Sequence, residues 1–328
     1  MPIKDKIKIC KRCIYDDATP KIEFDLEGVC NYCKLHDALL EEYKTGSNEG
    51  EAKFDKVVEN IKKKNKNKKY DVIVGVSGGT DSSFIIHQCV RKWGLRPLAV
   101  HYDNTWNTSI ATQNINKVLK KLNVDLYTHV VNNQEVDDIY LSFFKSGLPQ
   151  IDAATDIALA EVIYRAAKKY SIDVVFEGHS FMQEGVSPLG SSYADGQLIK
   201  SVHKTFGKLK LKTFPNMTFL KFLYWIVFKR IKKVRPLWYI KYSKQEARKI
   251  LEKEYNWEYY GGHHLENRMS AFNHSYYYPK KYNIDQRDNS LSAQVRSGEI
   301  KQKDAIDLYK EPPYLESEIL EYVKKRLN

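Results

Sequence analysis

Residues 70–83, YDVIVGVSGGTDSS, hold the groups in this chain best suited to bind phosphate. The apolar run from Val72 to Val76 predicts a buried strand, and the apolar spacing from Phe84 onward predicts a helix. Glycines between them let several backbone N–H groups point at one centre, and a helix N-terminus favours negative charge there. The segment therefore predicts a phosphate-binding loop, with an ordinary strand–turn–helix corner as the alternative. It is not a Walker A loop, because no lysine follows the glycines.

Strands and helices alternate along the chain after residue 70, which predicts a doubly wound, parallel, Rossmann-like α/β sheet. Ligands of such sheets bind at the carboxyl ends of the strands, near the point where the strand order reverses. Three predicted strand ends carry polar residues that we expect to form one site: Ser77–Ser83, His101–Asn104 and Glu177–Ser180. The predicted strands are 70–76, 97–102, 125–131 and 173–176, and the predicted helices are 82–93, 109–122 and 157–170, the last with Asp156 as its N-cap.

Four of the five cysteines form two CxxC pairs, Cys10 with Cys13 and Cys30 with Cys33. Sixteen residues separate the pairs, a spacing typical of tetrahedral zinc sites. We predict a structural Zn²⁺ site, because four thiolate ligands leave no coordination position for water. Disulfides are the alternative, which no secretory signal supports. Cys89 falls on the apolar face of a predicted helix and is interpreted as a core residue.

The chain has 328 residues and a net charge of +12, from 53 Lys and Arg against 41 Asp and Glu. This charge is compatible with RNA, an anionic membrane surface or a phosphorylated substrate, and also with solvated lysine runs such as Lys62–Lys69. The longest apolar stretch, Phe219–Phe228, has about half the ~20 residues that a membrane helix needs. We therefore expect a soluble, cytoplasmic protein, with peripheral attachment to the inner membrane left open.

The region after residue 200 is expected to be mostly helical. Aromatic, aliphatic and basic residues mix over 219–235, which fits either an amphipathic helix on a membrane or partner surface, or a helical hairpin packed on the sheet. Ser243 and Glu246 form a capping box that predicts a helix over 243–253. The adjacent His263 and His264 are interpreted as polar contacts to substrate or partner rather than a metal site. The predicted regions are a four-cysteine zinc module (1–50), a helix and Lys-rich linker (51–69), the α/β domain (70–200) and a helical C-terminal region for substrate and partner contacts (201–328).

The sequence SGGTDS resembles the pyrophosphate loop, or PP-loop, of ATP pyrophosphatases. Over almost its whole length the chain resembles PP-loop N-acetyl sugar amidotransferases of bacterial surface-polysaccharide and nonulosonic-acid biosynthesis. The departure is His263, where members of that family often carry lysine. The resemblance rests on the joint order of five segments: CKRCIYDDATPKIEFDLEGVCNYC, GVSGGTDSS, VHYDNTWN, EGHSFMQEG and GGHHLENRMSAFNHSYYYPKKYNIDQRDNSLSAQVRSG.

This resemblance implies a reaction. ATP would adenylate the oxygen of an N-acetyl group on a nucleotide-linked sugar and release pyrophosphate. Ammonia would then displace AMP and leave an acetamidino group, as a step in lipopolysaccharide and O-antigen or related surface-glycan biosynthesis. The implied cofactors are ATP, Mg²⁺ and Zn²⁺. The sequence identifies neither the sugar nor its nucleotide carrier.

The resemblance also implies the roles of individual residues. Ser77, Asp81 and Asp103 would be catalytic, and Asp81 or Asp103 would hold Mg²⁺. Cationic groups in the matching segments would meet the phosphates or carboxylate of the substrate. The nucleotide site would comprise Ser77, Gly78, Gly79, Thr80, Asp81, Ser82, Ser83, Asp103, Gly178 and His179. The substrate site would comprise Asn104, Trp106, Asn107, Glu184, Lys200, His203, Arg268 and Arg287.

The source of ammonia follows from the cysteines. Outside the four presumed zinc ligands only Cys89 remains, and its neighbours do not resemble a glutaminase nucleophile turn. The resemblance points to a separate glutaminase, similar to the glutaminase and cyclase pair of histidine biosynthesis. Candidate docking surfaces for it are 219–235 and the tail from Gly261 onward. Nucleic acid is not the expected partner.

Two other functions compete with this one. A PP-loop tRNA thiolase would also combine the loop with paired CxxC motifs, and the net charge suits RNA. It would need further cysteines in the catalytic domain, where only Cys89 is present. A non-catalytic zinc scaffold at the membrane, using 219–235, would leave the intact SGGTDS sequence unexplained.

Overall fold

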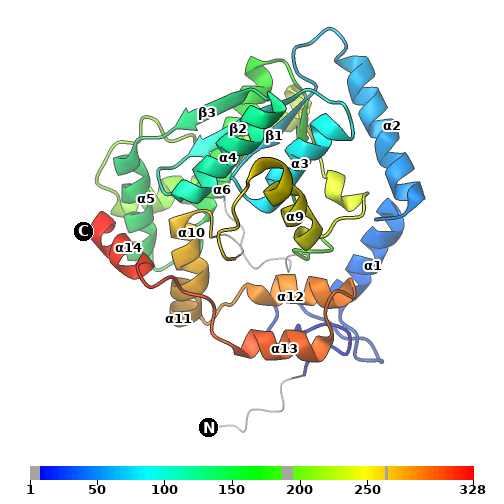
Figure 1. Ribbon diagram of the computed structural model, residues 1–328. Coiled ribbons are helices and arrows are strands. Elements are labelled where there is room, and N and C mark those ends of the chain that lie inside the picture. Colours follow the sequence, from blue (N-terminus) through cyan, green and yellow to red (C-terminus); the bar gives the residue numbers. More distant parts are fainter. Residues whose placement is uncertain (1–7, 187–194, 263–264) are drawn as a thin grey trace.

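The protein is described by a computed structural model over residues 8–186, 195–262 and 265–328 (Figure 1). Five parallel strands form one sheet in the order β3-β2-β1-β4-β5, which confirms the predicted doubly wound architecture. The chain moves from β1 outward to β3 and then returns to the other side of β1, so the strand order reverses between β1 and β4. The strands are β1 (Val72–Gly75), β2 (Pro97–Asp103), β3 (Leu126–Val130), β4 (Val174–Phe176) and β5 (Lys232–Val234).

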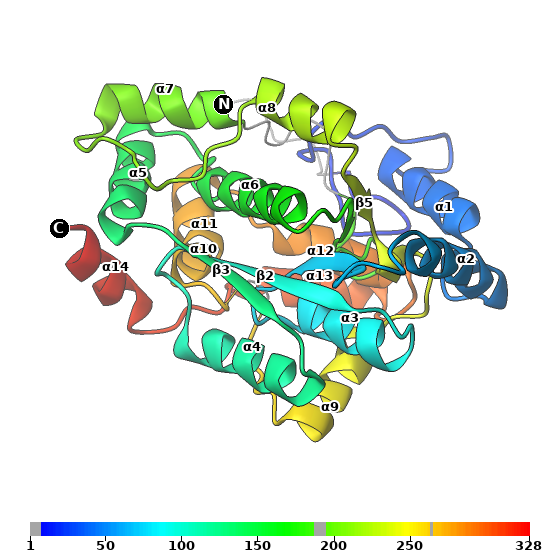
Figure 2. The same ribbon diagram turned by 90° about the horizontal axis from the view of Figure 1, so that it is seen from above.

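Helices cover both faces of the sheet because the side chains of its central strand alternate between two cores. Ile73 joins the core beneath α5, α6, α7, α10 and α14, whereas Val72 and Val74 join the core beneath α2, α3, α4 and α9. Figure 2 shows α6 on one side of the sheet and α3 and α4 on the other. These helices are α2 (Asn48–Lys64), α3 (Thr80–Arg91), α4 (Ser109–Leu122), α5 (Asn133–Ser146), α6 (Ala153–Lys169), α7 (Gly196–Phe206), α9 (Lys244–Tyr255), α10 (Arg268–Phe272) and α14 (Ile319–Leu327).

Four details differ from the sequence-based expectations. The fifth strand, β5, was missed because its sequence Lys-Lys-Val lacks apolar alternation, and lysines are common on exposed sheet edges. Residues 219–235 do not form one amphipathic helix: they form α8 (Phe219–Leu223), a π-helical turn at Tyr224–Phe228, and β5. Asp156 is not the N-cap of α6, because that helix starts at Ala153 and Asp156 lies in its first turn. The helix after Ser243 is confirmed, but the Ser243 side chain makes no capping hydrogen bond.

The N-terminal and C-terminal regions lie side by side. The cysteine segment leads into α1 (Asn31–Tyr43), and helices α12 (Arg287–Arg296) and α13 (Gln302–Lys310) return to it (Figure 1). Hydrogen bonds from Gln302 Nε2 to the carbonyl oxygens of Cys10 (2.7 Å) and Cys13 (2.8 Å) fix this contact. A short α11 (Tyr278–Tyr282), a π-helical turn at Asn273–Tyr277 and a 3-10 turn at Pro236–Trp238 complete the helices. In the part of the chain that the structure describes, no helix is both long and apolar enough to cross a membrane.

Candidate active site and cysteine cluster

The loop between β1 and α3 lies at the reversal of strand order, where ligands of doubly wound sheets bind. Ser77 N donates a hydrogen bond to Ser82 Oγ (3.4 Å), and Gly79 N donates to Ser77 Oγ (3.2 Å). These bonds hold the loop in a tight turn directly before the N-terminus of α3. The predicted strand, glycine turn and helix start are therefore present, and phosphate binding by this loop stays a prediction.

Position 78 requires glycine for two reasons, its backbone conformation and the close approach of α4. Its φ of +83° lies in the left-handed region, and a Cβ would overlap the carbonyl oxygen of Ala111 on α4. Its own carbonyl accepts a hydrogen bond from the buried Trp257 Nε1 (3.1 Å). A side chain at this position would therefore collide with α4.

Lys244, Asp81 and Glu184 form an ion-pair network beside the loop. Lys244 Nζ lies 3.1 Å from Asp81 Oδ2 and 3.0 Å from Glu184 Oε1, and Tyr242 Oη donates to Asp81 Oδ1. Burial raises the pKa of Asp81, although Lys244 opposes that shift. Burial lowers the pKa of Lys244, but the two carboxylates outweigh it and raise that pKa overall. The wall thus holds a protonated amine between two acidic side chains, only about a fifth of each being exposed.

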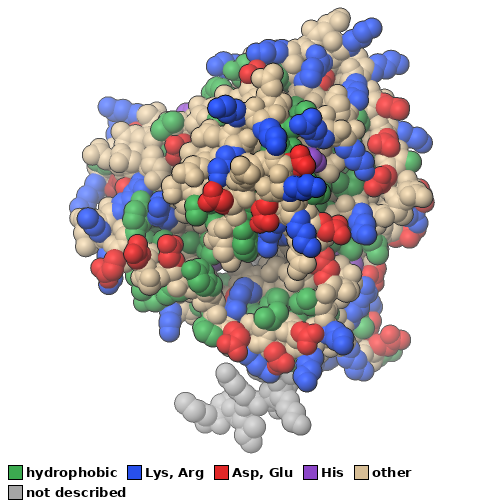
Figure 3. All heavy atoms as spheres, in the orientation of Figure 1, with side chains coloured by type: hydrophobic (Ala, Val, Ile, Leu, Met, Phe, Trp, Pro, Cys, Tyr) green, Lys and Arg blue, Asp and Glu red, His purple; other side chains and the backbone are tan. Residues whose placement is uncertain are grey.

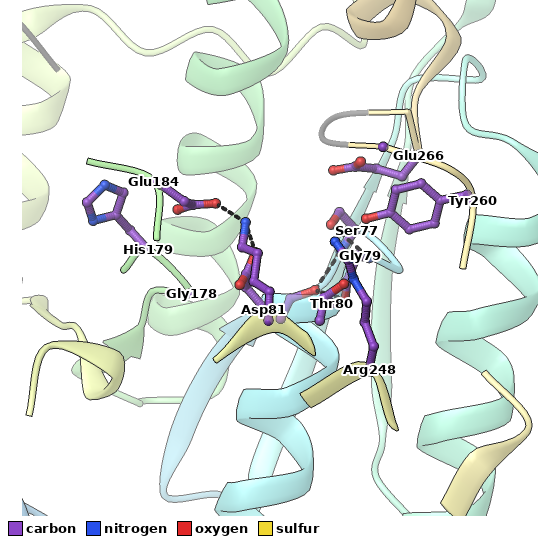
Figure 4. Close-up of a pocket in the computed structure, with 13 residues that line it drawn as sticks. Ser77, Gly79, Thr80, Asp81, Gly178, His179, Glu184, Arg248, Tyr260 and Glu266 are labelled. Atoms are coloured by element: carbon purple, nitrogen blue, oxygen red, sulfur yellow. Dashed lines mark hydrogen bonds and ion pairs between the residues drawn. The ribbon is translucent and has the colours of Figure 1, made fainter. Parts of the chain in front are cut away.

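The loop, this network and the C-terminal region enclose a cavity of about 200 Å³ (Figure 4). Arg248 comes from α9, one helical turn after Lys244, and its buried Nε has no hydrogen-bond partner in the described chain. The cationic side chains of Lys244 and Arg248 thus line the same cavity as the glycine loop after β1. The lining residues are Ser77, Gly79, Thr80, Asp81, Ser82, Gly178, His179, Glu184, Lys244, Arg248, Tyr260, Gly262 and Glu266.

The residues after β4 line the cavity beside the first turn of α3. Gly178 packs so closely that a Cβ there would lie 3.3 Å from Asp81 Cβ. His179 Nδ1 accepts a hydrogen bond from Trp238 Nε1 (3.2 Å), and burial lowers the pKa of this imidazole. A neutral His179 at neutral pH follows from that shift. Figure 4 shows Glu184 near His179 on one side of the cavity and Tyr260 and Glu266 on the other.

A second cavity of about 200 Å³ shares Tyr260 with the first. The first turn of α4 and the C-terminal helices line it. Together the two cavities fall within the ~300–1,000 Å³ usual for ligand sites. The lining residues are Thr108, Ser109, Ile110, Tyr260, Leu265, Arg268, Ala271, Ser275, Tyr314, Leu315, Glu316 and Ile319.

The residues predicted from the end of β2 lie outside both cavities. Asp103 Oδ1 accepts from Thr105 N (2.8 Å) and stabilises the turn after the strand. Trp106 is fully buried and donates from Nε1 to Asp137 Oδ1 (2.8 Å). Asn104 and Asn107 both accept from Asn267 Nδ2, which fastens the C-terminal region to this strand end. Their observed contacts are structural.

The other predicted substrate residues are spread over the molecule. Glu184 lines the first cavity and Arg268 the second. His203 lies on α7 with Nε2 2.8 Å from Asp138 Oδ2, and Lys200 is exposed on the same helix. Arg287 pairs with Asp285 and donates to carbonyl oxygens of residues 308, 309 and 311. Ser83 is buried behind the loop, and His263 and His264 fall outside the described residues.

The C-terminal half contributes a part of the site that was not predicted from the sequence. Lys244, Arg248 and Tyr260 line the first cavity but follow no recognisable motif, and Glu266 lies in the segment GGHHLENRM without having been named as a site residue. The one available signal was the spacing of Lys244 and Arg248, which places both on one face of the predicted helix 243–253. Tyr260 lies three residues before His263, in a segment noted in the sequence for its two histidines.

The four N-terminal cysteines form one buried cluster. Their Sγ atoms all lie within 4.8 Å of one another, and three of the pairs are separated by 3.6, 3.7 and 3.8 Å. These distances exceed the ~2.05 Å of a disulfide bond. They match the edge of about 3.8 Å expected for a tetrahedron with zinc–sulfur bonds of ~2.3 Å. A cubic iron–sulfur cluster lies between its ligands and would hold their sulfurs farther apart. The donor set and spacing therefore fit a single zinc ion.

Arg296 of α12 covers this cluster from the C-terminal region. Its Nη2 donates to Cys13 Sγ (3.2 Å) and its Nε to Cys33 Sγ (3.4 Å), and its guanidinium lies 4.7 Å from the centre of the Tyr15 ring. Only 7% of Arg296 is exposed. A buried cation beside four sulfurs is favourable when those sulfurs are thiolates, so the cluster has the electrostatic partner that a metal–thiolate centre needs.

Comparison with known proteins finds a family match in the C-terminal region. Residues 266–328 match the family described as LPS biosynthesis protein WbpG-like, C-terminal domain. A protein of uncharacterized function from Methanocaldococcus jannaschii is 26% identical over 171 residues. That match spans 52% of this chain and 58% of the relative's length.

Two solved structures are similar to the chain at low identity. The U34-tRNA thiolase NcsA from Methanococcus maripaludis, determined with its iron–sulfur cluster, is 13% identical with a TM-score of 0.37; the alignment covers 94% of this chain and 90% of that one. The ammonia-dependent NAD synthetase from Campylobacter jejuni is 16% identical with a TM-score of 0.32, covering 80% and 97%. Residues 266–328 are thus similar to the C-terminal domain of WbpG-like lipopolysaccharide biosynthesis proteins, and the loop SGGTDS lies where the strand order of the sheet reverses.

Proposed function

We propose that this protein is an ATP-dependent, AMP-forming amidotransferase that acts on a nucleotide-linked N-acetyl sugar in surface-glycan biosynthesis. The N-acetyl oxygen attacks the α-phosphorus of ATP, and the bond to pyrophosphate breaks. Ammonia then adds to the carbon of the adenylated group, AMP leaves with the oxygen, and the nitrogen loses protons to become an acetamidino group. The WbpG-like domain supports the pathway, and the loop supports the use of ATP.

The observation that carries this proposal is the convergence of phosphate-binding groups on one cavity. Backbone N–H groups of the loop, Lys244 and Arg248 all reach it, at the point where the strand order reverses. An amide carbonyl is a poor electrophile, so the reaction requires its oxygen to become a leaving group. The loop would bind the departing pyrophosphate as charge develops on its oxygens.

Each charged group has a role in this scheme. Lys244 and Arg248 would neutralise the β and γ phosphates, since both are cations that line the cavity. Carboxylate oxygens suit Mg²⁺, so Asp81 and Glu184 would hold it, where it would neutralise phosphate charge. Asp103 is not proposed as a ligand, because its Oδ1 accepts from Thr105 N and it lines neither cavity. Ser77 would donate to a phosphate oxygen.

The second cavity is proposed to hold the sugar nucleotide. It opens beside the loop cavity at Tyr260, so a group bound there can reach the α-phosphate. Arg268 and the hydroxyl groups of Thr108, Ser109 and Ser275 would recognise phosphate and sugar oxygens. The matched C-terminal domain supplies part of this wall, so the domain would determine which sugar is accepted.

Ammonia is proposed to come from a separate glutaminase. All five cysteines of the chain are buried, four in the N-terminal cysteine cluster and Cys89 in the core between the sheet and α3. Burial also raises the pKa of Cys89, which makes it a poor nucleophile. The isolated chain should therefore use ammonium salts but not glutamine, and a matching glutaminase should make glutamine an efficient donor.

A direct test incubates the protein with ATP, an ammonium salt and a panel of UDP- or CMP-linked N-acetyl sugars. We expect AMP, pyrophosphate and a product lighter by the difference between oxygen and an NH group. Ser77→Ala and Asp81→Ala should abolish AMP formation, whereas Lys241→Met, an exposed change near α9, should not. Formation of thiolated tRNA from a persulfide donor, with no sugar product, would replace the proposal by the thiolase function.

A further inference from the structure

The positive charge of this protein is concentrated in one stretch of chain. Residues 196–245 contain 13 Lys and Arg and no Asp or Glu, out of 53 basic and 41 acidic residues in the whole sequence. The rest of the chain therefore has 40 basic and 41 acidic residues, close to neutrality. Figure 3, which views another face, shows basic and acidic side chains interspersed. The net charge of +12 is thus a property of one segment.

The same segment exposes large apolar side chains. Leu220 and Phe228 are 78% and 76% exposed, and Phe219 and Val227 are more than half exposed. Isolated apolar residues at a surface are common, but a contiguous group rimmed by charge marks an interaction site. We call this surface the basic-apolar edge. Its exposed members in the described chain are Lys200, Lys204, Phe206, Lys208, Leu209, Lys210, Lys212, Phe219, Leu220, Val227, Phe228, Lys229, Arg230, Lys232 and Lys233.

Contacts with the body of the protein hold this edge in place. Trp225 is buried and donates from Nε1 to Glu161 Oε2 on α6 (2.9 Å), and Ile231 N donates to Trp225 O (3.2 Å). Gly196 N donates to Met217 O (2.9 Å), which joins the start of α7 to the residues before α8. Figure 2 shows α7 and α8 along one outer side of the molecule, beyond α6. The inward side chains anchor the segment while its other side chains face solvent.

A basic hollow lies beside these apolar side chains. A cavity of about 520 Å³ between α6 and α8 is lined by Arg165, Lys168, Lys169 and Lys221, together with Glu161, Tyr224 and Trp225. Lys221 Nζ (2.5 Å) and Arg165 Nε (2.6 Å) both lie against Glu161 Oε1. One carboxylate thus faces four cations, so the hollow has a net positive charge that suits a phosphate group.

We propose that the basic-apolar edge docks the protein on the surface of an anionic phospholipid bilayer. Leu220, Val227 and Phe228 would enter the boundary between headgroups and acyl chains, and the lysines around them would meet lipid phosphates. A bilayer requires both features, exposed apolar side chains and unopposed positive charge. RNA would use the charge but not the aliphatic side chains. The inference does not depend on the proposed reaction.

The test is sedimentation of the full chain with lipid vesicles. We expect binding to vesicles of phosphatidylcholine mixed with phosphatidylglycerol, little binding to phosphatidylcholine alone, and release at about 0.5 M salt, because salt screens the attraction to anionic headgroups. Leu220→Ser with Phe228→Ser should weaken binding by at least about tenfold, since both side chains would lose their burial in lipid. Lys208→Glu with Lys210→Glu should weaken it by at least about tenfold as well.

Matched control variants distinguish binding through the basic-apolar edge from nonspecific binding of vesicles to the protein surface. Leu26→Ser with Leu308→Ser removes two exposed leucines elsewhere, and Lys63→Glu with Lys66→Glu makes the same charge change at the end of α2. Both controls should bind like the wild type. The proposal is overturned if the wild type does not bind anionic vesicles, or if the controls lose binding as strongly as the edge variants. It is also overturned if the edge variants abolish binding of a glutaminase while vesicle binding is unchanged.

Discussion

Replacing Lys244 by methionine tests the charge network at the centre of the candidate site. The ammonium lies 3.1 Å from Asp81 and 3.0 Å from Glu184, and only 18% of the Lys244 side chain is exposed. Methionine keeps most of the volume but removes the charge, so two carboxylates face each other with no cation between them. Removing one partner of a buried ion pair usually costs ~3–5 kcal/mol. Because each side chain here keeps some contact with water, we expect about 3 kcal/mol.

The loss should depend on pH in a defined direction. Burial already raises the pKa of Asp81 above its ordinary value, and removal of Lys244 should raise it further. An acid whose folded-state pKa is raised favours the folded state at low pH and loses that contribution as pH rises through the folded pKa. The deficit of Lys244→Met relative to the wild type should therefore be larger at about pH 8 than at about pH 5.

Equilibrium urea unfolding at these two pH values measures the deficit. Lys241→Met is the matched control, because Lys241 is exposed three residues earlier and should change stability little. The double variant Lys244→Met/Glu184→Gln should recover part of the loss, by about 0.5–3 kcal/mol of coupling, because it removes one of the two carboxylates that Lys244→Met leaves facing each other. Equal stability of Lys244→Met and the wild type at both pH values would show that the network carries no net energy. A deficit that does not change with pH would show that ionisation of Asp81 is not its cause.

Three further predictions follow from the same structure. Arg296→Met should speed transfer of zinc to a chromophoric chelator and weaken zinc binding by about 10–100-fold, since it removes two N–H donors to the thiolates, whereas Arg287→Met on the same helix should not. Gly78→Val should yield little folded protein, because its Cβ would overlap Ala111 O and its φ is +83°; a normally folded, AMP-forming variant would contradict this. Burial raises the pKa of Asp288 to about 7, so its contribution to stability is present below about pH 4 and lost as pH rises through 7. Asp288→Asn should therefore increase the free energy of unfolding at pH 8 by up to about 4 kcal/mol, which a higher melting temperature would report. It should give no gain near pH 4.

The sheet and the loop could be predicted because their signals are local. Val72 to Val76 combine β-branched residues with flanking turn residues, and the glycines of 77–79 fall directly before a helical pattern. The cysteine cluster was predictable for the same reason, since its spacing alone implies a shared centre. In each case the residues that cooperate are close in sequence, so periodicity and spacing contain the information.

The far half of the site could not be predicted in this way. Lys244 and Arg248 reach the loop because α9 packs against α3, which is a tertiary contact with no trace in local sequence. Conversely, Trp106 follows a strand end, where a site residue is expected, but its side chain turns into the core and donates to Asp137. Position at a strand end therefore did not determine whether a side chain faces the cavity, because the direction of each side chain depends on tertiary packing.

The cysteine cluster and the loop are also connected by packing, although they are separated in sequence. Arg296 joins α12 to the cluster, and Gly185 lies so close to α12 that a Cβ would stand 2.8 Å from Asn289 O. Glu184 precedes that glycine and pairs with Lys244 in the cavity. A shift of α12 would therefore displace Glu184, because no side chain separates the two backbones at Gly185. Metal binding couples to the folding of the region around it. We therefore expect loss of the metal to disturb the cavity wall through α12 even though no cysteine touches that cavity.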